Sequence, residues 1–68
     1  MDGTTLAQRR EALGISHQQL ADEVGISRVT IWRIEKTGQQ PTPLMARSID
    51  AALSRLEAQA SALIERVG

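Results

Sequence analysis

The side chains best suited to binding chemistry in this sequence gather in residues 27–36, SRVTIWRIEK. Trp32 is the only aromatic residue of the chain, and Arg28, Arg33 and Lys36 all lie within one helical turn of it. Arginine and lysine donate hydrogen bonds, and a guanidinium can bind guanine O6 and N7 through two parallel bonds. A lone Trp ordinarily lies in the core. Its place among cations therefore indicates a contact surface in this segment.

Catalytic and metal-binding chemistry have little support in the same sequence. There is no Cys, His17 is the only histidine, and no arrangement of acids suggests a catalytic site in so small a chain. A lone His without Cys or paired carboxylates is a poor metal site, and the lack of Cys excludes a disulfide framework. We therefore expect a protein that is not an enzyme and that uses no cofactor and no metal.

Length and charge restrict the remaining possibilities. A chain of 68 residues allows one domain of marginal stability, for which oligomerisation is a common support. Lys plus Arg number 8 and Asp plus Glu number 8, a balance that argues against a non-specific polyanion binder but not against a few well-placed cations. No apolar run is long enough for a membrane span and no signal peptide opens the chain. The expected location is cytoplasmic, with no membrane partner.

Glycines divide the first half of the chain into three short helical stretches. Gly14, Gly25 and Gly38 each follow a segment with helical periodicity, where a left-handed residue commonly ends a helix. Between the second and third stretches lie only residues 25–27, a spacing typical of a helix-turn-helix.

Predicted N-caps mark the starts of the same helical stretches. Ser16 and Ser27 are predicted N-caps, and Gln19 follows Ser16 at the spacing of a capping box. Apolar periodicity predicts which residues face the core, with Arg10 between two of them on the first helix. The predicted inward residues are Leu6, Leu13, Leu20, Ala21, Val24, Ile31 and Ile34.

The second half predicts one long helical segment. Thr42 and Pro43 make a favourable helix start, and residues 43–67 contain no further Gly or Pro. Met45, Ile49, Ala52 and Leu53 are expected to close the core. The fold class is thus an all-α bundle of four to five helices with an extended C-terminal helix. We expect a domain over residues 1–53 and a helical extension over residues 54–68, and the pattern does not decide whether 43–67 is one helix or two.

The extension carries an apolar stripe that the short helices are not expected to cover. An exposed stripe of that length is a liability, which pairing with a second copy of the chain removes. A looser bundle or a helix bent back on itself is the alternative, because the heptad spacing is kept only in part. The residues expected in the dimer contact are Leu56, Ala60, Leu63, Ile64 and Val67.

Residues 6–38, LAQRREALGISHQQLADEVGISRVTIWRIEKTG, are followed by a proline and an apolar helix. Together they resemble the DNA-binding domains of the lambda-repressor and Cro type, also called the XRE type, over residues 6–53. Family members commonly break after a short fourth helix, which this sequence does not. The resemblance implies a sequence-specific regulator of transcription that binds double-stranded DNA. It favours a small homodimeric repressor that reads an inverted repeat through helix 27–36 in the major groove.

The resemblance also implies roles for individual residues. Arg28 and Arg33 are the best candidates to read bases, Lys36 is better placed for a phosphate, and His17 stands where many relatives have Gln, which leaves open a mild pH dependence of binding. The alternatives are a merely solvated helix face, a His17 without a role, and a Trp32 half buried against the fourth helix. The residues expected to contact DNA are His17, Gln18, Ser27, Arg28, Val29, Thr30, Trp32, Arg33, Lys36 and Gln39.

Two more charges carry structural expectations. By the same resemblance, Arg10 and Glu35 form a structural ion pair, which would explain a cation on an otherwise apolar face. Arg9 remains available as an additional member of the cationic surface. A protein-binding module, such as an antitoxin or an adaptor that uses the C-terminal helix, is the competing interpretation. No small-molecule effector is predicted.

Overall fold

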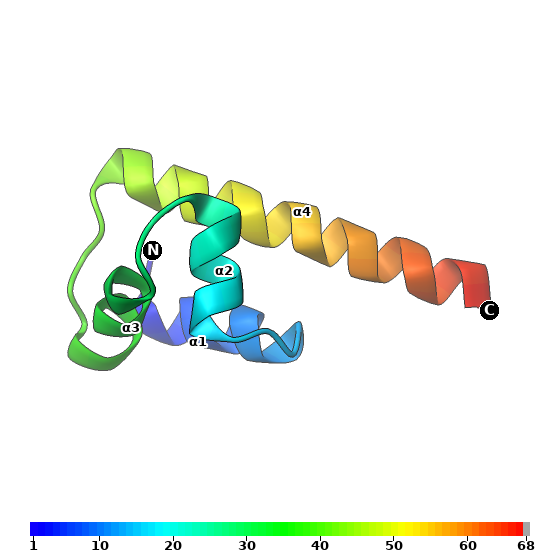
Figure 1. Ribbon diagram of the computed structural model, residues 1–68, viewed down its shortest axis with the longest axis horizontal. Coiled ribbons are helices and arrows are strands. Elements are labelled where there is room, and N and C mark those ends of the chain that lie inside the picture. Colours follow the sequence, from blue (N-terminus) through cyan, green and yellow to red (C-terminus); the bar gives the residue numbers. More distant parts are fainter. Residues whose placement is uncertain (68) are drawn as a thin grey trace.

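The computed structural model describes residues 1–67, which form four α-helices and no strand. They are α1 (Gly3–Ala12), α2 (His17–Val24), α3 (Arg28–Thr37) and α4 (Pro43–Val67). Figure 1 shows α1, α2 and α3 gathered against the N-terminal half of α4, while the C-terminal half of α4 projects past them. The all-α prediction is confirmed, with four helices in the described part of the chain.

Side-chain caps begin the helices where the sequence predicts them. Ser16 Oγ accepts a hydrogen bond from the Gln19 amide at 3.0 Å, and Gln19 Oε1 accepts one from the Ser16 amide at 2.7 Å. This capping box satisfies two amides that would otherwise lack partners at the start of α2. Ser27 and Thr42 cap α3 and α4 with their hydroxyl groups.

The turn between α2 and α3 depends on Gly25. Its φ of 88° is left-handed, a conformation in which a side chain would be strained. The amides of Gly25 and Ile26 both donate to the Ala21 carbonyl, at 2.8 and 3.0 Å, and so close the last turn of α2. Gly14 and Gly38 are left-handed as well, so all three predicted glycine helix ends are confirmed.

The core is aliphatic and is shared by all four helices. Leu13, Val24 and Met45 lie at its edge, partly buried. The periodicity prediction of the inward faces is therefore confirmed on each helix. The fully buried apolar residues are Leu6, Leu20, Ala21, Ile31, Ile34, Ile49, Ala52 and Leu53.

Helix α1 approaches the backbone of α3 unusually closely. Gly3 is buried, and a Cβ atom at this position would overlap the carbonyl oxygen of Ile34. Only a residue without a side chain allows this separation of the two helices. Gly3 thus helps to set the distance between α1 and α3.

Helix α4 runs without interruption through the expected boundary between residues 53 and 54. Leu56, expected in a dimer contact, packs partly buried against the core of its own chain. The short helices thus reach further along α4 than expected, because apolar spacing shows which face of a helix is apolar but not where its neighbours end. A contact of Leu56 with a second copy stays a prediction. The packed part of α4 therefore continues past the expected boundary.

Polar contacts hold α4 to the rest of the fold. Arg9 Nη1 lies 2.6 Å from Asp50 Oδ1, while its Nε and Nη2 donate to the two carboxylate oxygens of Glu57 at 2.9 and 2.7 Å. Arg9 is thus committed to α4, which corrects the expectation that it adds to the cationic surface. A second contact joins α4 to α2, where Arg55 Nη2 lies 3.7 Å from Glu23 Oε1.

None of the helices described is both long and apolar enough to cross a membrane.

Candidate nucleic-acid interface

The outward face of α3 carries most of the side chains that the sequence singled out. Because Ile31 and Ile34 point into the core, the opposite stripe faces solvent. Trp32 on this stripe is 47% exposed, so it is not a core residue. Arg28 and Arg33 are exposed on the same helix, and Lys36 follows in its last turn.

The cations of α3 differ from three of the four described arginines on the other helices, the exception being Arg47 of α4. Arg28, Arg33 and Lys36 form no hydrogen bond or ion pair through their side chains with any described residue. By contrast, three other arginines are held by carboxylates: Arg9 by Asp50 and Glu57, Arg10 by Glu35, and Arg55 by Glu23. The donors of α3 are therefore available to a partner, although the sequence has no net positive charge.

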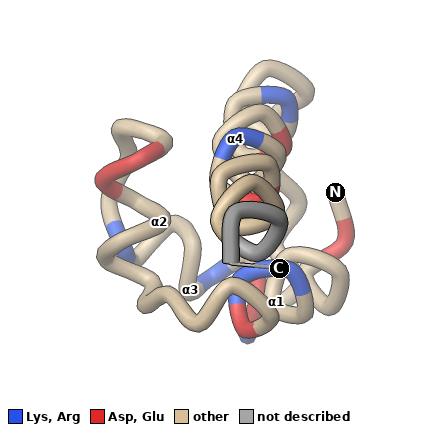
Figure 2. The backbone as a smooth tube through the Cα atoms, turned by 90° about the vertical axis from the view of Figure 1, so that its right-hand side faces the viewer, with Lys and Arg blue, Asp and Glu red and all other residues tan. Residues whose placement is uncertain are grey.

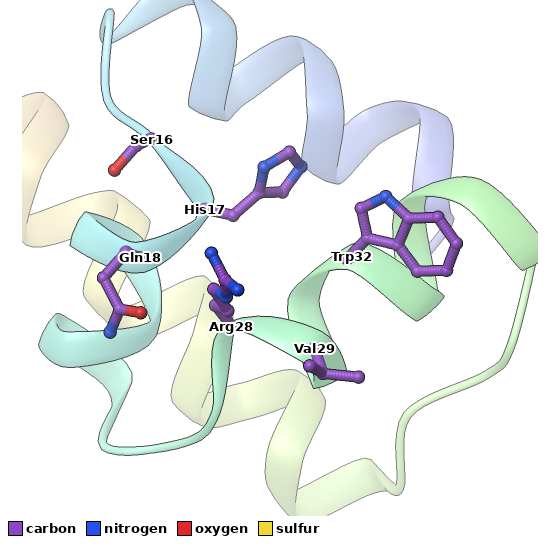
Figure 3. A pocket seen from close by; sticks show the side chains of 6 residues that line it. All are labelled: Ser16, His17, Gln18, Arg28, Val29 and Trp32. Atoms are coloured by element: carbon purple, nitrogen blue, oxygen red, sulfur yellow. The ribbon is translucent and has the colours of Figure 1, made fainter.

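A shallow depression of about 330 Å³ separates the start of α2 from the outward face of α3. Figure 3 shows the Arg28 side chain reaching across toward the first turn of α2, with Trp32 on the α3 side. The first amides of a helix have no intrahelical acceptor, and the helix dipole makes this end electropositive. The depression thus combines an anion-attracting helix start with a guanidinium. Its lining residues are Ser16, His17, Gln18, Arg28, Val29 and Trp32.

None of the residues that line this depression is acidic. Figure 2 shows the acidic segment of α2 near the C-terminal end of that helix, where Asp22 and Glu23 lie. Gln18 Nε2 donates to Asp22 Oδ1 at 2.7 Å, so this contact competes with the expected role of Gln18 toward DNA. The sequence has zero net charge, yet the cations of α3 have no carboxylate partner among the described residues, whereas Arg9, Arg10 and Arg55 do.

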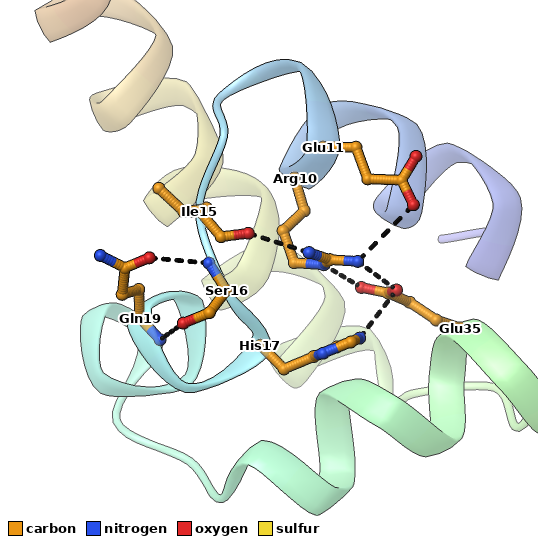
Figure 4. Close-up of polar contacts among 7 residues, drawn as sticks. All are labelled: Arg10, Glu11, Ile15, Ser16, His17, Gln19 and Glu35. Carbon is orange, nitrogen blue, oxygen red and sulfur yellow. Dashed lines mark hydrogen bonds and ion pairs between the residues drawn. The ribbon is translucent and has the colours of Figure 1, made fainter.

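A buried ion pair lies directly beneath the depression. Arg10 Nε and Nη2 bind the two carboxylate oxygens of Glu35 at 2.7 and 3.0 Å, and Arg10 Nη1 donates to the Ile15 carbonyl at 2.8 Å. The Glu35 side chain is only 1% exposed. Figure 4 shows these contacts joining α1 to α3, so Arg10 is occupied inside the fold.

His17 is part of the same network. Its Nε2 lies 3.1 Å from Glu35 Oε1, so one carboxylate connects α1, α2 and α3. Burial by itself would raise the pKa of Glu35, but the hydrogen bonds and charge of Arg10, with a smaller contribution from His17, hold it below its ordinary value. The imidazole that was expected to contact DNA is thus also bonded inward.

The other residues expected to contact DNA lie at the two ends of α3. Ser27 Oγ and Thr30 Oγ1 lie 3.1 Å apart at the start of α3, where Ser27 also serves as the cap. Gln39 is exposed in the segment after α3. The side chains that the structure describes include no cluster of His, Cys, Asp and Glu suited to a metal ion.

The expected dimer residues lie on the projecting part of α4. Leu63 is 62% exposed and Ala60 is partly buried. Ile64 and Val67, the other two expected residues, have side chains outside the described part of the structure.

Comparison with known proteins agrees with this architecture. Residues 3–63 match the model of a family described as a helix-turn-helix domain. An uncharacterized HTH-type transcriptional regulator of Methanothermobacter thermautotrophicus is 36% identical over 52 residues, which cover 76% of this chain and 75% of that protein. No solved structure matches the chain significantly. The family model matches most of the chain, and α2 and α3 are joined by a short turn at Gly25. The chain therefore belongs to the helix-turn-helix domain family.

Proposed function

We propose that this protein is a sequence-specific regulator of transcription that binds double-stranded DNA. It acts as a small homodimeric repressor, with α3 in the major groove and an inverted repeat as its site. The family supports this proposal, as does the description of the Methanothermobacter thermautotrophicus relative as an HTH-type transcriptional regulator.

The observation that carries the proposal is the distribution of paired and unpaired cations. Arg28, Arg33 and Lys36 of α3 have no partner among the described residues, whereas Arg9 and Arg10 of α1 are held by carboxylates. A helix that presents its donors on an exposed face beside the electropositive start of another helix suits the acceptor-rich major groove and its flanking phosphates. The opposite face of α3 is occupied by the core, which leaves only this orientation for binding.

Each cation has a distinct role in this arrangement. Arg28 and Arg33 are assigned to base edges because a guanidinium can bond guanine O6 and N7 together. Lys36 in the last turn of α3 is assigned to a phosphate. The first turn of α2, with His17 and Gln18, is assigned to a second phosphate, because free amides and the helix dipole favour an anion there.

The projecting half of α4 supports the homodimer. Leu63 is 62% exposed on a helix that extends past the packed part of the fold, and a second copy would cover it. A two-fold dimer presents its two recognition helices about 34 Å apart, one turn of B-DNA. This geometry corresponds to an inverted repeat.

Selection of bound duplexes from a random pool tests the proposal. We expect enrichment of one inverted repeat, with Arg33→Ala weakening binding to it by about 1–3 kcal/mol and relaxing the preference at one base pair. Lys36→Ala is the matched control on the same helix and should weaken all sequences about equally, since it contacts a phosphate. A uniform loss for Arg33→Ala would instead assign Arg33 to the backbone.

The exposed end of α4 also favours a second candidate, a protein-binding module of the antitoxin or adaptor kind. That function is the better account if no sequence is enriched and if Arg28→Ala and Arg33→Ala leave activity in the cell intact. The two candidates are separated because the first depends on the α3 face and the second on the end of α4.

A further inference from the structure

Two apolar side chains stand on the outward face of α3. Val29 is 46% exposed and Trp32 is 47% exposed, and their spacing of three residues places them on one side of the helix. Ile31 and Ile34, at 0% and 2% exposed, already supply the contribution of α3 to the core. The fold therefore does not need an apolar residue at either exposed position.

Their surroundings point to a particular kind of partner. Val29 and Trp32 line the depression of about 330 Å³ together with Arg28, and the start of α2 lines its other side (Figure 3). The guanidinium and the α2 dipole favour a partner that is negatively charged and rich in acceptors. The two apolar side chains require that this partner also present an apolar group next to its acceptors.

The major groove offers that combination in a specific form. Guanine shows two acceptors there, O6 and N7, and the C5-methyl of thymine is the apolar group on the base edges. Resting on the proposed function, we infer that Arg28, Val29 and Trp32 together read a guanine with a thymine at a neighbouring base pair. Arg28 binds guanine O6 and N7, while Val29 and Trp32 contact the thymine methyl.

This inference gives Trp32 a role in specificity. A contact from its indole N–H to a phosphate would not depend on base sequence, and it would leave Val29 without a function because valine has no side-chain donor. A shared methyl contact accounts for both residues. It also makes a chemical prediction that a backbone contact does not make, namely that binding depends on one methyl group.

Deoxyuridine is the probe, because it lacks the C5-methyl of thymidine and keeps the same base pairing. Each thymine of the selected duplex is replaced in turn, and binding is followed by the anisotropy of a fluorescent label on the DNA. We expect one position in each half-site to lose about fourfold in affinity, which corresponds to about 0.8 kcal/mol for one buried methyl-sized group. At that position, Val29→Ala and Trp32→Ala should each bring the ratio of thymine to uracil affinities close to one.

Leu44→Ala is the matched control, since Leu44 is an apolar residue 76% exposed on α4 and outside the depression. It should keep the fourfold ratio, and far-UV circular dichroism verifies that all three variants are folded. The inference is overturned if no thymine shows a methyl effect, or if the effect persists in both Val29→Ala and Trp32→Ala. A chain that binds its selected duplex tightly but ignores the methyl refutes this inference alone, whereas a chain that enriches no duplex refutes the proposed function.

Discussion

Two glutamates of this protein form ion pairs of the same geometry at very different depths. Glu35 binds Nε and Nη2 of Arg10 at 2.7 and 3.0 Å, and Glu57 binds Nε and Nη2 of Arg9 at 2.9 and 2.7 Å. The Glu35 side chain is 1% exposed and that of Glu57 is 41% exposed. Replacing each with Gln therefore compares the loss of similar hydrogen bonds inside the fold and at its surface.

The expected losses differ several-fold. Glu35→Gln leaves the buried Arg10 cation with only the exposed Glu11 carboxylate, 3.7 Å from Nη2, as a counter-charge, which costs about 3–5 kcal/mol of the free energy of unfolding. Glu57→Gln breaks a solvent-screened pair and should cost about 0.2–1 kcal/mol. At typical stabilities per residue, a chain of this length unfolds with roughly 3–10 kcal/mol, so the first loss approaches the whole stability of a single copy.

Urea denaturation followed by far-UV circular dichroism and by Trp32 fluorescence measures both losses. If Glu35→Gln is largely unfolded, combining it with Arg10→Met provides a second measurement, because removing the unpaired charge should recover much of the stability. Equal losses for Glu35→Gln and Glu57→Gln would refute the reasoning. The reasoning would also be refuted if the variant that combines Arg10→Met with Glu35→Gln were clearly less stable than Glu35→Gln alone.

Three further predictions concern acid, packing and assembly. The pKa of Glu35 is lower in the folded chain than its ordinary value of 4.5. The ionised Glu35 therefore contributes its full stabilisation above pH 4.5, and this contribution is lost as the pH falls through the folded pKa. Below about pH 5, the urea midpoint should consequently change less with pH in Glu35→Gln than in the unmodified chain. Gly3→Ala should lower the free energy of unfolding by about 1–3 kcal/mol because its Cβ meets the Ile34 carbonyl, whereas Gln8→Ala on the exposed side of α1 should change thermal stability little. Leu63→Glu should halve the sedimentation mass and leave the helical circular dichroism of the fold intact, and an unchanged mass would place the dimer contact elsewhere.

Local rules predicted most of the helical framework from the sequence. The Ser16 and Gln19 capping box and the left-handed Gly25 depend on residues within a few positions of one another, so spacing alone identifies them. The inward faces were equally accessible, because each helix repeats its apolar residues with the helical period. Once Ile31 and Ile34 were assigned to the core, the exposure of Trp32 followed.

Those rules could not predict contacts between residues that are far apart in the sequence. The bonds of Arg9 to Asp50 and Glu57 span 41 and 48 residues, and they depend on how α4 crosses α1. The contact of His17 with Glu35 spans 18 residues and requires α2 and α3 to be placed to within about an ångström, at hydrogen-bonding distance. The one available signal was a histidine at a helix start near a predicted buried carboxylate, which did not specify the direction of the imidazole.

The unbroken course of α4 has a consequence for how its length can vary. One residue added between Glu57 and Leu63 would rotate everything beyond it by about 100° and move it by about 1.5 Å. In the proposed dimer, such a rotation would turn one recognition helix away from the face of DNA that the other contacts. Seven added residues would restore the direction to within roughly 20° while moving the two halves apart. Seven residues lengthen the helix by about 10.5 Å, well short of the ~34 Å turn of B-DNA, so restoring the direction of α4 would not by itself return both recognition helices to one face of the DNA. In such a dimer, the length of α4 beyond Glu57 would therefore be fixed to the residue.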